Sequence, residues 1–498
     1  MLALTKKKFP AYFRDRVTCG VRVTNATVFL LLGLCACTSV APRDASHKSF
    51  DVPVAWSVAN VSQTTSTNSL TQWWSRFNDP LLTSLVAQAL QSGTSVKSAQ
   101  AALQQARALR DVSEASLWPS INASASAGRS KVGHNPSVNS FATGLDASWE
   151  LDIFGAKRGA LSASEAAARA SAASLGDVQV SIAAEVALDY IALRSVQARL
   201  TIANDNLISQ QETLQITRWR LQAGLVSSLE LEQARAAAEQ TRALLPTLQT
   251  SIDQGIHALS VLTGQPPTTL LTLLTTATPI PQANDDLALS IPAETLRQRP
   301  DVRSAEYQVT AAQARLAQAD AARLPNFSLS GSFGLKAATL GSLTSSDSVV
   351  SSMLAGILMP VFDGGALRAQ VRAQQAALEQ AHLAYQATVL TALTNVEDAL
   401  VALRGDRERL LSLQQAAEAA SNAALMAHQR YASGLVDFQT VLDTQRSQLT
   451  TQDSVALASG NVSTDHVRLY KALGGGWRAD SEDLKLTSKK IADRTSTP

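Results

Sequence analysis

The feature that most constrains this chain of 498 residues is that its sequence repeats itself once. Residues 96–99 (VKSA) return as residues 302–305 (VRSA), and residues 220–226 (RLQAGLV) return as residues 430–436 (RYASGLV). The order of the matches is kept, and their offset changes only from 206 to 210 residues. A period of this length is too long for a solenoid of small units. We therefore predict that one sizeable structural half was duplicated in tandem.

The duplication sets the expected domain boundaries, because the linker between the halves is rich in proline and threonine. The length alone would otherwise suggest two or three ordinary domains. The predicted segments are a leader of residues 1–36, an extended segment of residues 37–69, a first repeat of residues 70–265, a linker of residues 266–284, a second repeat of residues 285–475 and a tail of residues 476–498.

Long stretches without proline permit very long helices in both halves. Pro136 and Pro246 enclose 109 residues without proline, and none occurs in residues 361–497. Leucines at positions 193, 200, 207, 214 and 221 recur every seven residues, which is typical of a left-handed coiled coil. Residues 159–222 would form a helix of about 95 Å at about 1.5 Å per residue. Pro246 falls in the next predicted helix, which it is expected to kink or interrupt.

Each half also carries two stretches that alternate between apolar and small or polar residues, as strands do. The alternation is clearest in residues 141–153 and 327–335, and residues 120–131 and 348–361 complete a set of four. Segments of about ten alternating residues separated by loops are typical of a transmembrane β-barrel.

Four strands cannot close a barrel, because the smallest bacterial barrels need about eight and open edges do not survive in lipid. Three copies would supply about twelve strands. The predicted fold class is therefore mainly α with a β-barrel part, a trimeric duct with four strands and long coiled-coil helices in each chain. The alternative is a soluble four-strand sheet. Trp118, Trp149 and Phe362 near the strand ends favour the membrane, since aromatic residues gather at bilayer interfaces.

The N-terminus has the pattern of a secretory signal peptide. A basic leader precedes an apolar run at residues 28–34, and Leu34-Cys35-Ala36-Cys37 resembles a bacterial lipobox. Residues 1–36 carry six Lys or Arg and one Asp, so their removal would change the formal net charge from +2 to −3. Cys37 is then the predicted lipidation site. A plain signal peptide cut at a nearby small residue is the alternative, and the length of the leader also leaves a downstream start codon open.

Composition and spacing argue against enzymes and nucleic-acid binding. The near-neutral charge gives no footprint for nucleic acid, and three cysteines supply no disulfide framework or four-ligand zinc site. We find no Gly-rich phosphate loop and no nucleophile elbow, so we predict no catalytic residue, no metal site and no cofactor besides the lipid. The histidines show no metal-ligand spacing and are expected on solvated faces and in loops: His47, His134, His257, His382, His428 and His466.

Four motifs in order along the chain carry a family resemblance: residues 73–81 (WWSRFNDPL), 148–155 (SWELDIFG), 262–267 (LTGQPP) and 299–306 (RPDVRSAE). The chain resembles an outer-membrane factor of the TolC/OprM type, closest to the NodT-like lipoprotein branch of resistance-nodulation-division (RND) efflux systems. The resemblance covers nearly the whole mature chain. It implies a homotrimer, lipid-anchored in the outer membrane and extending into the periplasm as a helical tunnel. It also implies docking to a periplasmic adaptor (membrane fusion) protein and an inner-membrane RND-type pump.

The resemblance assigns adaptor docking to the turns at the ends of two long helical hairpins. The residues concerned are Arg220, Gly224, Leu225, Arg430, Gly434 and Leu435. Glycine ends a helix in a left-handed turn, and a short turn would leave each leucine exposed. For the two arginines, capping of the helix dipole and contact with the adaptor stay open.

The resemblance also places a periplasmic gate in the helix after the second turn. Asp443 matches an acidic position of the family's constriction and Arg446 a basic one; they are three residues apart and so share a helix face. Gln439 stands where a relative has an apolar residue, which departs from the family pattern. An ordinary surface ion pair is the alternative.

The expected function is therefore the outer-membrane channel of a tripartite efflux system that passively conducts small molecules, and the protein is not expected to be an enzyme. One alternative is the outer-membrane duct of a type I protein secretion system. A second alternative, from a different class, is a periplasmic lipid-anchored coiled-coil scaffold.

Overall fold

The computed structural model describes residues 70–283 and 293–477 of the chain. The predicted leader, Cys37 and the extended segment to residue 69 lie outside the described residues, as does most of the predicted tail.

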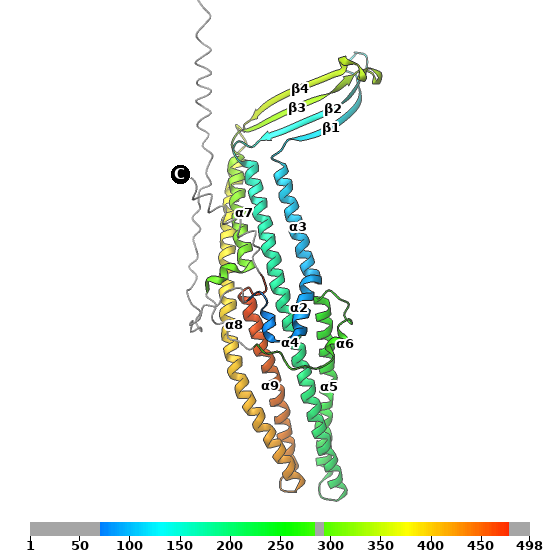
Figure 1. Ribbon diagram of the computed structural model, residues 1–498, viewed down its shortest axis with the longest axis vertical. Helices are drawn as coiled ribbons and strands as arrows, with labels where there is room; N and C mark the ends of the chain where they lie inside the picture. The colour runs from blue at the N-terminus through cyan, green and yellow to red at the C-terminus, as the bar shows by residue number, and fades with distance from the viewer. Residues whose placement is uncertain (1–69, 284–292, 478–498) are drawn as a thin grey trace, which may run out of the picture. The chain divides into compact units, whose positions relative to one another are not determined.

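The helices and strands of the second half repeat those of the first (Figure 1). The first half contains η3 (Trp73–Phe77), α2 (Pro80–Ser92), α3 (Thr94–Ala115), β1 (Ser120–Ser130), β2 (Val138–Leu151), α4 (Ala156–Gln222) and α5 (Ser228–Leu262). The short α6 (Leu271–Leu274) lies in the linker. The second half contains η5 (Ala293–Gln298), α7 (Pro300–Ala321), β3 (Asn326–Ala337), η6 (Leu340–Thr344), η7 (Ser346–Ser348), β4 (Val349–Leu358), α8 (Ala366–Ala432) and α9 (Phe438–Ala472).

Matching helices have identical lengths. Both α3 and α7 have 22 residues, α4 and α8 have 67, and α5 and α9 have 35. The tandem duplication and the very long helices are therefore confirmed. Pro246 does not interrupt α5, contrary to one of the two expected outcomes. The proline lies on the exposed side of the helix, where losing one backbone N–H leaves the surrounding hydrogen bonds in place.

The four predicted strands form one antiparallel sheet in the order β1-β2-β3-β4. The central pair joins the two halves, with Leu145 opposite Phe333 and Trp149 opposite Leu329. β4 ends at Leu358, three residues before the predicted end, because Pro360 has no N–H to donate to a ladder. β1 and β4 are the two edges of the sheet, so within one chain each has a side without a strand partner.

The long helices pack through small and apolar residues. α4 lies against α3 and α5 of its own half and against α7 and α9 of the other half. In the predicted leucine seam, Leu193, Leu207 and Leu214 are buried. In Figure 1 the sheet lies at one end of these helices, and the α4–α5 and α8–α9 turns lie at the other. Within residues 70–283 and 293–477, no helix combines the length and the apolar character that a membrane crossing requires.

The main core surrounds the start of the described chain. Trp73 is fully buried and stacks on Tyr470 at a centroid distance of 5.4 Å, with Trp74 and Phe77 edge-on to it. Asp79 caps α2 through the amides of Leu81 and Leu82 and accepts a hydrogen bond of 2.7 Å from the Tyr190 hydroxyl of α4. The segment that follows the predicted N-terminal extension is thereby fastened to α4 and α9.

Candidate functional site at the hairpin turns

The two hairpin turns have the same backbone geometry in both halves. Gly224 and Gly434 have φ angles of 73° and 75°, in the left-handed region. The amide of Leu225 donates to the carbonyl of Arg220 at 2.8 Å, and the amide of Leu435 donates to the carbonyl of Arg430 at 2.9 Å. These bonds close each long helix as a Schellman turn, for which glycine is the preferred residue.

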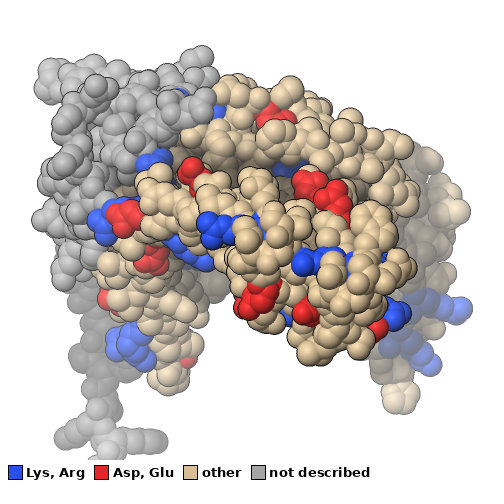
Figure 2. All heavy atoms as spheres, turned by 90° about the horizontal axis from the view of Figure 1, so that it is seen from below, with Lys and Arg blue, Asp and Glu red and all other residues tan. Residues whose placement is uncertain are grey.

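Each turn presents a leucine to solvent. Leu225 is 68% exposed and Leu435 is 73% exposed. An exposed apolar side chain at a rigid turn is suited to a partner that covers it. Figure 2, which views the helices from the end with the turns, shows Lys, Arg, Asp and Glu interspersed with uncharged residues. Neither sign of charge dominates this surface.

Arg220 bridges the two hairpins. Its Nη1 donates to the carbonyl of Tyr431 at 2.7 Å, and its guanidinium lies 4.4 Å from the centroid of the Tyr431 ring. Arg220 therefore caps the carboxyl end of α8 rather than that of its own helix. Of the two roles left open, capping is observed for Arg220, but on the neighbouring helix. Arg430 is exposed.

The predicted ion pair of the second hairpin is present. Arg446 Nη1 lies 3.6 Å from Asp443 Oδ1, and both side chains are more than half exposed. Gln439 Nε2 donates to the same Asp443 oxygen at 3.0 Å. The three residues thus form one exposed polar cluster on α9, held by contacts that contribute little to stability in water.

A polar ladder between α4 and α9 was missed by the sequence analysis. Arg199 Nε contacts Asp453 Oδ1 at 2.6 Å, and farther along α4 Asn206 and Thr213 each contact a glutamine of α9 at 2.9 Å, Gln452 and Gln445 respectively. The α4 residues recur every seven positions and end at Arg220, each directly before a leucine of the seam. That heptad position is the signal that could have found them.

One histidine was placed wrongly by the sequence analysis. His466 of α9 is 2% exposed, and its Nε2 lies 3.1 Å from Arg407 Nη2 of α8. Next to it, Asp465 is 1% exposed and contacts Arg468 at 3.1 Å. Burial raises the pKa of Asp465 to about 6; the hydrogen bond from Arg468 lowers it and the nearby Asp406 raises it further.

Replacing Asp465 with asparagine is expected to stabilise the protein at neutral pH. Because the pKa of Asp465 is raised in the folded state, the contribution of its protonated form to the free energy of unfolding is fully present below the unfolded pKa of about 3.9. That contribution is lost as the pH rises through about 6. The gain for Asp465→Asn should therefore approach at most about 3 kcal/mol above pH 7 and vanish near pH 4. Urea unfolding at pH 4 and pH 7.5 measures it. The exposed Asp205→Asn is the control, and an equal effect of Asp465→Asn at both pH values would contradict the prediction.

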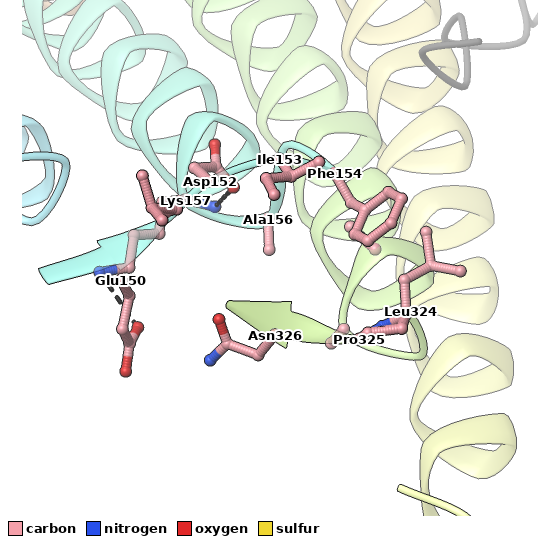
Figure 3. A pocket seen from close by; sticks show the side chains of 12 residues that line it. Glu150, Asp152, Ile153, Phe154, Ala156, Lys157, Leu324, Pro325 and Asn326 are labelled. Carbon is pink, nitrogen blue, oxygen red and sulfur yellow. Dashed lines mark hydrogen bonds and ion pairs between the residues drawn. The ribbon is translucent and has the colours of Figure 1, made fainter. Parts of the chain in front are cut away.

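A cavity of about 220 Å³ lies where the sheet meets the helices. In Figure 3, Glu150, Asp152 and Lys157 lie on one side of it, and Phe154 and Leu324 lie on the other. The Asp152 carboxylate accepts from the Lys157 amide at 3.0 Å, and Lys157 Nζ pairs with Glu150 at 3.1 Å. The charged groups therefore have partners within the chain. We interpret the cavity as part of the structural connection between β2 and α4 and assign no binding site to it. No cluster that could hold a metal ion is found among the described residues.

The fold, with a sheet at one end of long helices and two helix-turn-helix tips at the other, is the fold of solved outer-membrane channels. The chain belongs to the outer membrane efflux protein family, whose sequence profile matches residues 85–265 and 291–475. The predicted family, fold class, outer-membrane localisation and function as the channel of a tripartite efflux system are thereby confirmed. Channels of this family are trimers.

Individual relatives agree with this assignment. The chain is 30% identical to the pyoverdine export outer membrane protein OpmQ of Pseudomonas aeruginosa, over 91% of this chain and 97% of OpmQ. It is 28% identical to the probable outer membrane lipoprotein SilC of Salmonella typhimurium, over 91% of this chain and 98% of SilC. The solved outer-membrane channel OprN has 34% identity and a TM-score of 0.79, over 86% of this chain and 98% of OprN. The soluble-sheet and scaffold alternatives have no counterpart among these relatives.

Proposed function

We propose that three copies of this chain form a passive export duct that docks to a periplasmic adaptor protein and, through it, to an inner-membrane RND-type pump that supplies the energy. The observation that carries this proposal is the pair of matched glycine turns, which present Leu225 and Leu435 at the end of the helices away from the sheet. The free edges of β1 and β4 support closure of a barrel by neighbouring copies.

A lipid on Cys37 is part of the proposal. The lipobox-like sequence supports it, as does the description of the relative SilC as a probable lipoprotein. The fastening of residues 73–79 to α4 and α9 would then connect the lipid anchor to the helical body.

Deletion of the gene tests the function. Loss of the duct should sensitise cells to small antibiotics or metals, because the antibiotic or metal that the pump expels would then accumulate in the periplasm. Wild-type susceptibility combined with loss of one secreted protein would instead indicate a type I secretion duct and contradict the efflux proposal.

We further propose that Asp443, Arg446 and Gln439 belong to the periplasmic gate. Three copies would place three such clusters around one axis, where their carboxylates repel one another unless each is paired. The weak exposed pair between Asp443 and Arg446 suits a contact that is exchanged on opening.

Asp443→Ala is expected to raise the conductance of the channel in planar bilayers and to sensitise cells to large antibiotics. The substitution removes the acceptor of both Arg446 and Gln439 and the charge of the proposed ring. Glu232→Ala is the matched control, since Glu232 forms a similar exposed pair with Arg235 three residues away on α5. Unchanged conductance of the Asp443 variant would place the gate elsewhere.

A further inference from the structure

We infer that Arg129 and Lys131, at the end of β1 away from the helices, bind a phosphate of a glycolipid in the outer leaflet of the membrane. The inference rests on the barrel of the proposed function and adds a lipid-binding site on the outer surface of that barrel. The site combines two cations with a strip of small apolar side chains. Its ligand is therefore the phosphorylated headgroup of a lipid rather than free phosphate.

The sheet has one apolar face and one polar face. Its three registers pair odd-numbered residues with odd-numbered ones and even with even, so residues of like parity share a face in all four strands. The even-numbered face is rich in serine, with Ser120 bonded to Ser148 and Ser332 to Ser352 at 2.8 Å. The odd-numbered face carries the large apolar side chains Leu145, Trp149, Leu329, Phe333, Met353 and Ile357. In a membrane barrel the odd-numbered residues, here called the lipid face, meet the bilayer and the serines line the lumen.

Trp149 and Arg129 mark the two ends of the lipid face. Trp149 lies next to the helices, where its Nε1 donates to the Leu117 carbonyl at 2.9 Å. Arg129 lies at the far end of β1 (Figure 1), opposite Asn139, which is ten residues before Trp149 on β2. At about 3.3 Å per residue and a strand tilt of about 40°, these two levels lie about 25 Å apart along the barrel axis, the height of the apolar band of such barrels. Because the helices extend into the periplasm, Arg129 lies at the outer headgroup level.

Arg129 is an exception on its face. Among the odd-numbered residues of the four described strands, it is the one that carries a charge. Lys131 follows the end of β1 directly, and both side chains are exposed. Neither side chain has a hydrogen bond or an ion pair with another residue of the described ranges. A cation on the lipid face is costly at the bilayer midplane and tolerated near the headgroups, so its position suits a headgroup partner.

The residues around Arg129 fit both parts of a phosphorylated lipid. A guanidinium binds phosphate through two parallel hydrogen bonds, and the lysine ammonium adds a second charge. Below Arg129 the lipid face of β1 consists of Ala127, Ala125 and Ala123. Their small side chains let an acyl chain of the same lipid lie close to the strand, which removes apolar surface from water.

Asp347 is the acid that competes for these cations. Residues 128–140 contain no Asp or Glu, whereas Asp347 lies in η7, directly before β4. β1 and β4 are the open edges of the sheet, so closure of a barrel brings β4 of one copy to β1 of the next. An ion pair of Arg129 with Asp347 of the partner subunit would stabilise the trimer without any lipid, and this outcome is separated below.

Binding of purified lipid A to the purified trimer tests the site. Native mass spectrometry in detergent counts bound lipid over a range of lipid A concentrations. Arg129→Gln combined with Lys131→Gln should weaken the binding at least tenfold, because each cation near an anionic lipid surface contributes about a fivefold factor. Arg129→Lys combined with Lys131→Arg should retain the binding, since both charges stay.

Two controls isolate the face and the phosphate. Lys336→Gln should bind lipid A like the wild type, because Lys336 lies on the even-numbered face of the same sheet, opposite Ala142. Lipid A stripped of its phosphates should bind the wild type and the double glutamine variant equally. Equal affinity of these two proteins for intact lipid A would overturn the inference. Competition by inorganic pyrophosphate as effective as that by lipid A would also overturn it, since the site would then bind a free anion.

Trimer stability and conductance separate the remaining outcomes. If Arg129→Gln and Asp347→Asn lower the dissociation temperature of the lipid-free trimer equally, Arg129 pairs with Asp347 of the partner subunit and the lipid site is wrong. The double glutamine variant should conduct in planar bilayers like the wild type. Unchanged lipid binding with normal conductance would therefore remove the site alone, whereas a wild type without conductance would contradict the duct itself.

Discussion

Replacing Gly224 or Gly434 with tryptophan is expected to reduce efflux to the level of a deletion strain, while trimer and membrane levels stay normal. Both glycines have φ angles above 70°, which a residue with a Cβ adopts at a cost of about 1–2 kcal/mol. This cost is small for a chain with helices of 67 residues, so the fold should survive. The effect arises from the bulky ring at the exposed end of the hairpin, where the proposed adaptor must approach.

The two turns should differ in one respect. A Cβ at Gly224 meets open space, whereas at Gly434 it lies 3.7 Å from Arg220 Nη2. The Gly434 variant is therefore expected to disturb the bridge from Arg220 to the Tyr431 carbonyl as well as the docking surface. Minimal inhibitory concentrations and copurification with the adaptor measure both effects.

A matched control separates docking from backbone strain. Gly133 has a φ of 59° with open space in front of it, and it lies in the loop between β1 and β2, at the sheet end of the molecule. Gly133→Trp carries a similar backbone cost but should leave efflux unchanged. Full efflux in both the Gly224 and Gly434 variants would show that the turns are not the docking points.

Trp73→Ala is expected to destabilise the protein by about 3–5 kcal/mol, the usual cost of removing a large buried aromatic side chain. Trp73 is fully buried, stacks on Tyr470 of α9 and has two further aromatic neighbours. Trp73 also packs closely against the end of the second half: a Cβ added at Gly475 would lie 2.9 Å from Trp73 Cδ1. Removing the ring leaves a cavity that the surrounding helices are too long and too firmly packed to close.

Urea unfolding of the purified trimer measures this loss, and limited proteolysis should show earlier cleavage near residue 73. Trp118→Ala is the control, because Trp118 is 71% exposed. Trp73→Phe should lower the free energy of unfolding clearly less than Trp73→Ala, since phenylalanine keeps most of the stacking area on Tyr470. A loss below 1 kcal/mol for Trp73→Ala would mean that the N-terminal segment is not anchored at this point.

The sequence was sufficient for the elements whose signals are local. The heptad leucines and the absence of proline predicted α4, and the alternation of residues predicted the sheet. The glycine turns followed from local conformation, because a left-handed residue at a helix end favours glycine wherever it occurs. The family resemblance singled out Asp443 and Arg446, and their contact followed from helical spacing, because residues three apart share a helix face.

The sequence failed where a side chain depends on a distant segment. His466 was expected in solvent but is buried against α8, because its single-residue polarity says nothing about which face of α9 meets a neighbour. The interruption that was one of the two expected effects of Pro246 does not occur, since a helix held by packing on both sides of a proline tolerates the loss of one hydrogen bond.

The sequence by itself determined the duplication, the presence and order of the long helices and strands, and the position of both hairpin turns, because these depend on local periodicity and on residues that end helices. Only the tertiary structure decided that Arg220 caps α8 and that α4 lies on α9. Those contacts join residues more than 200 positions apart, and which of two equivalent helices becomes the neighbour is decided by how the two halves pack.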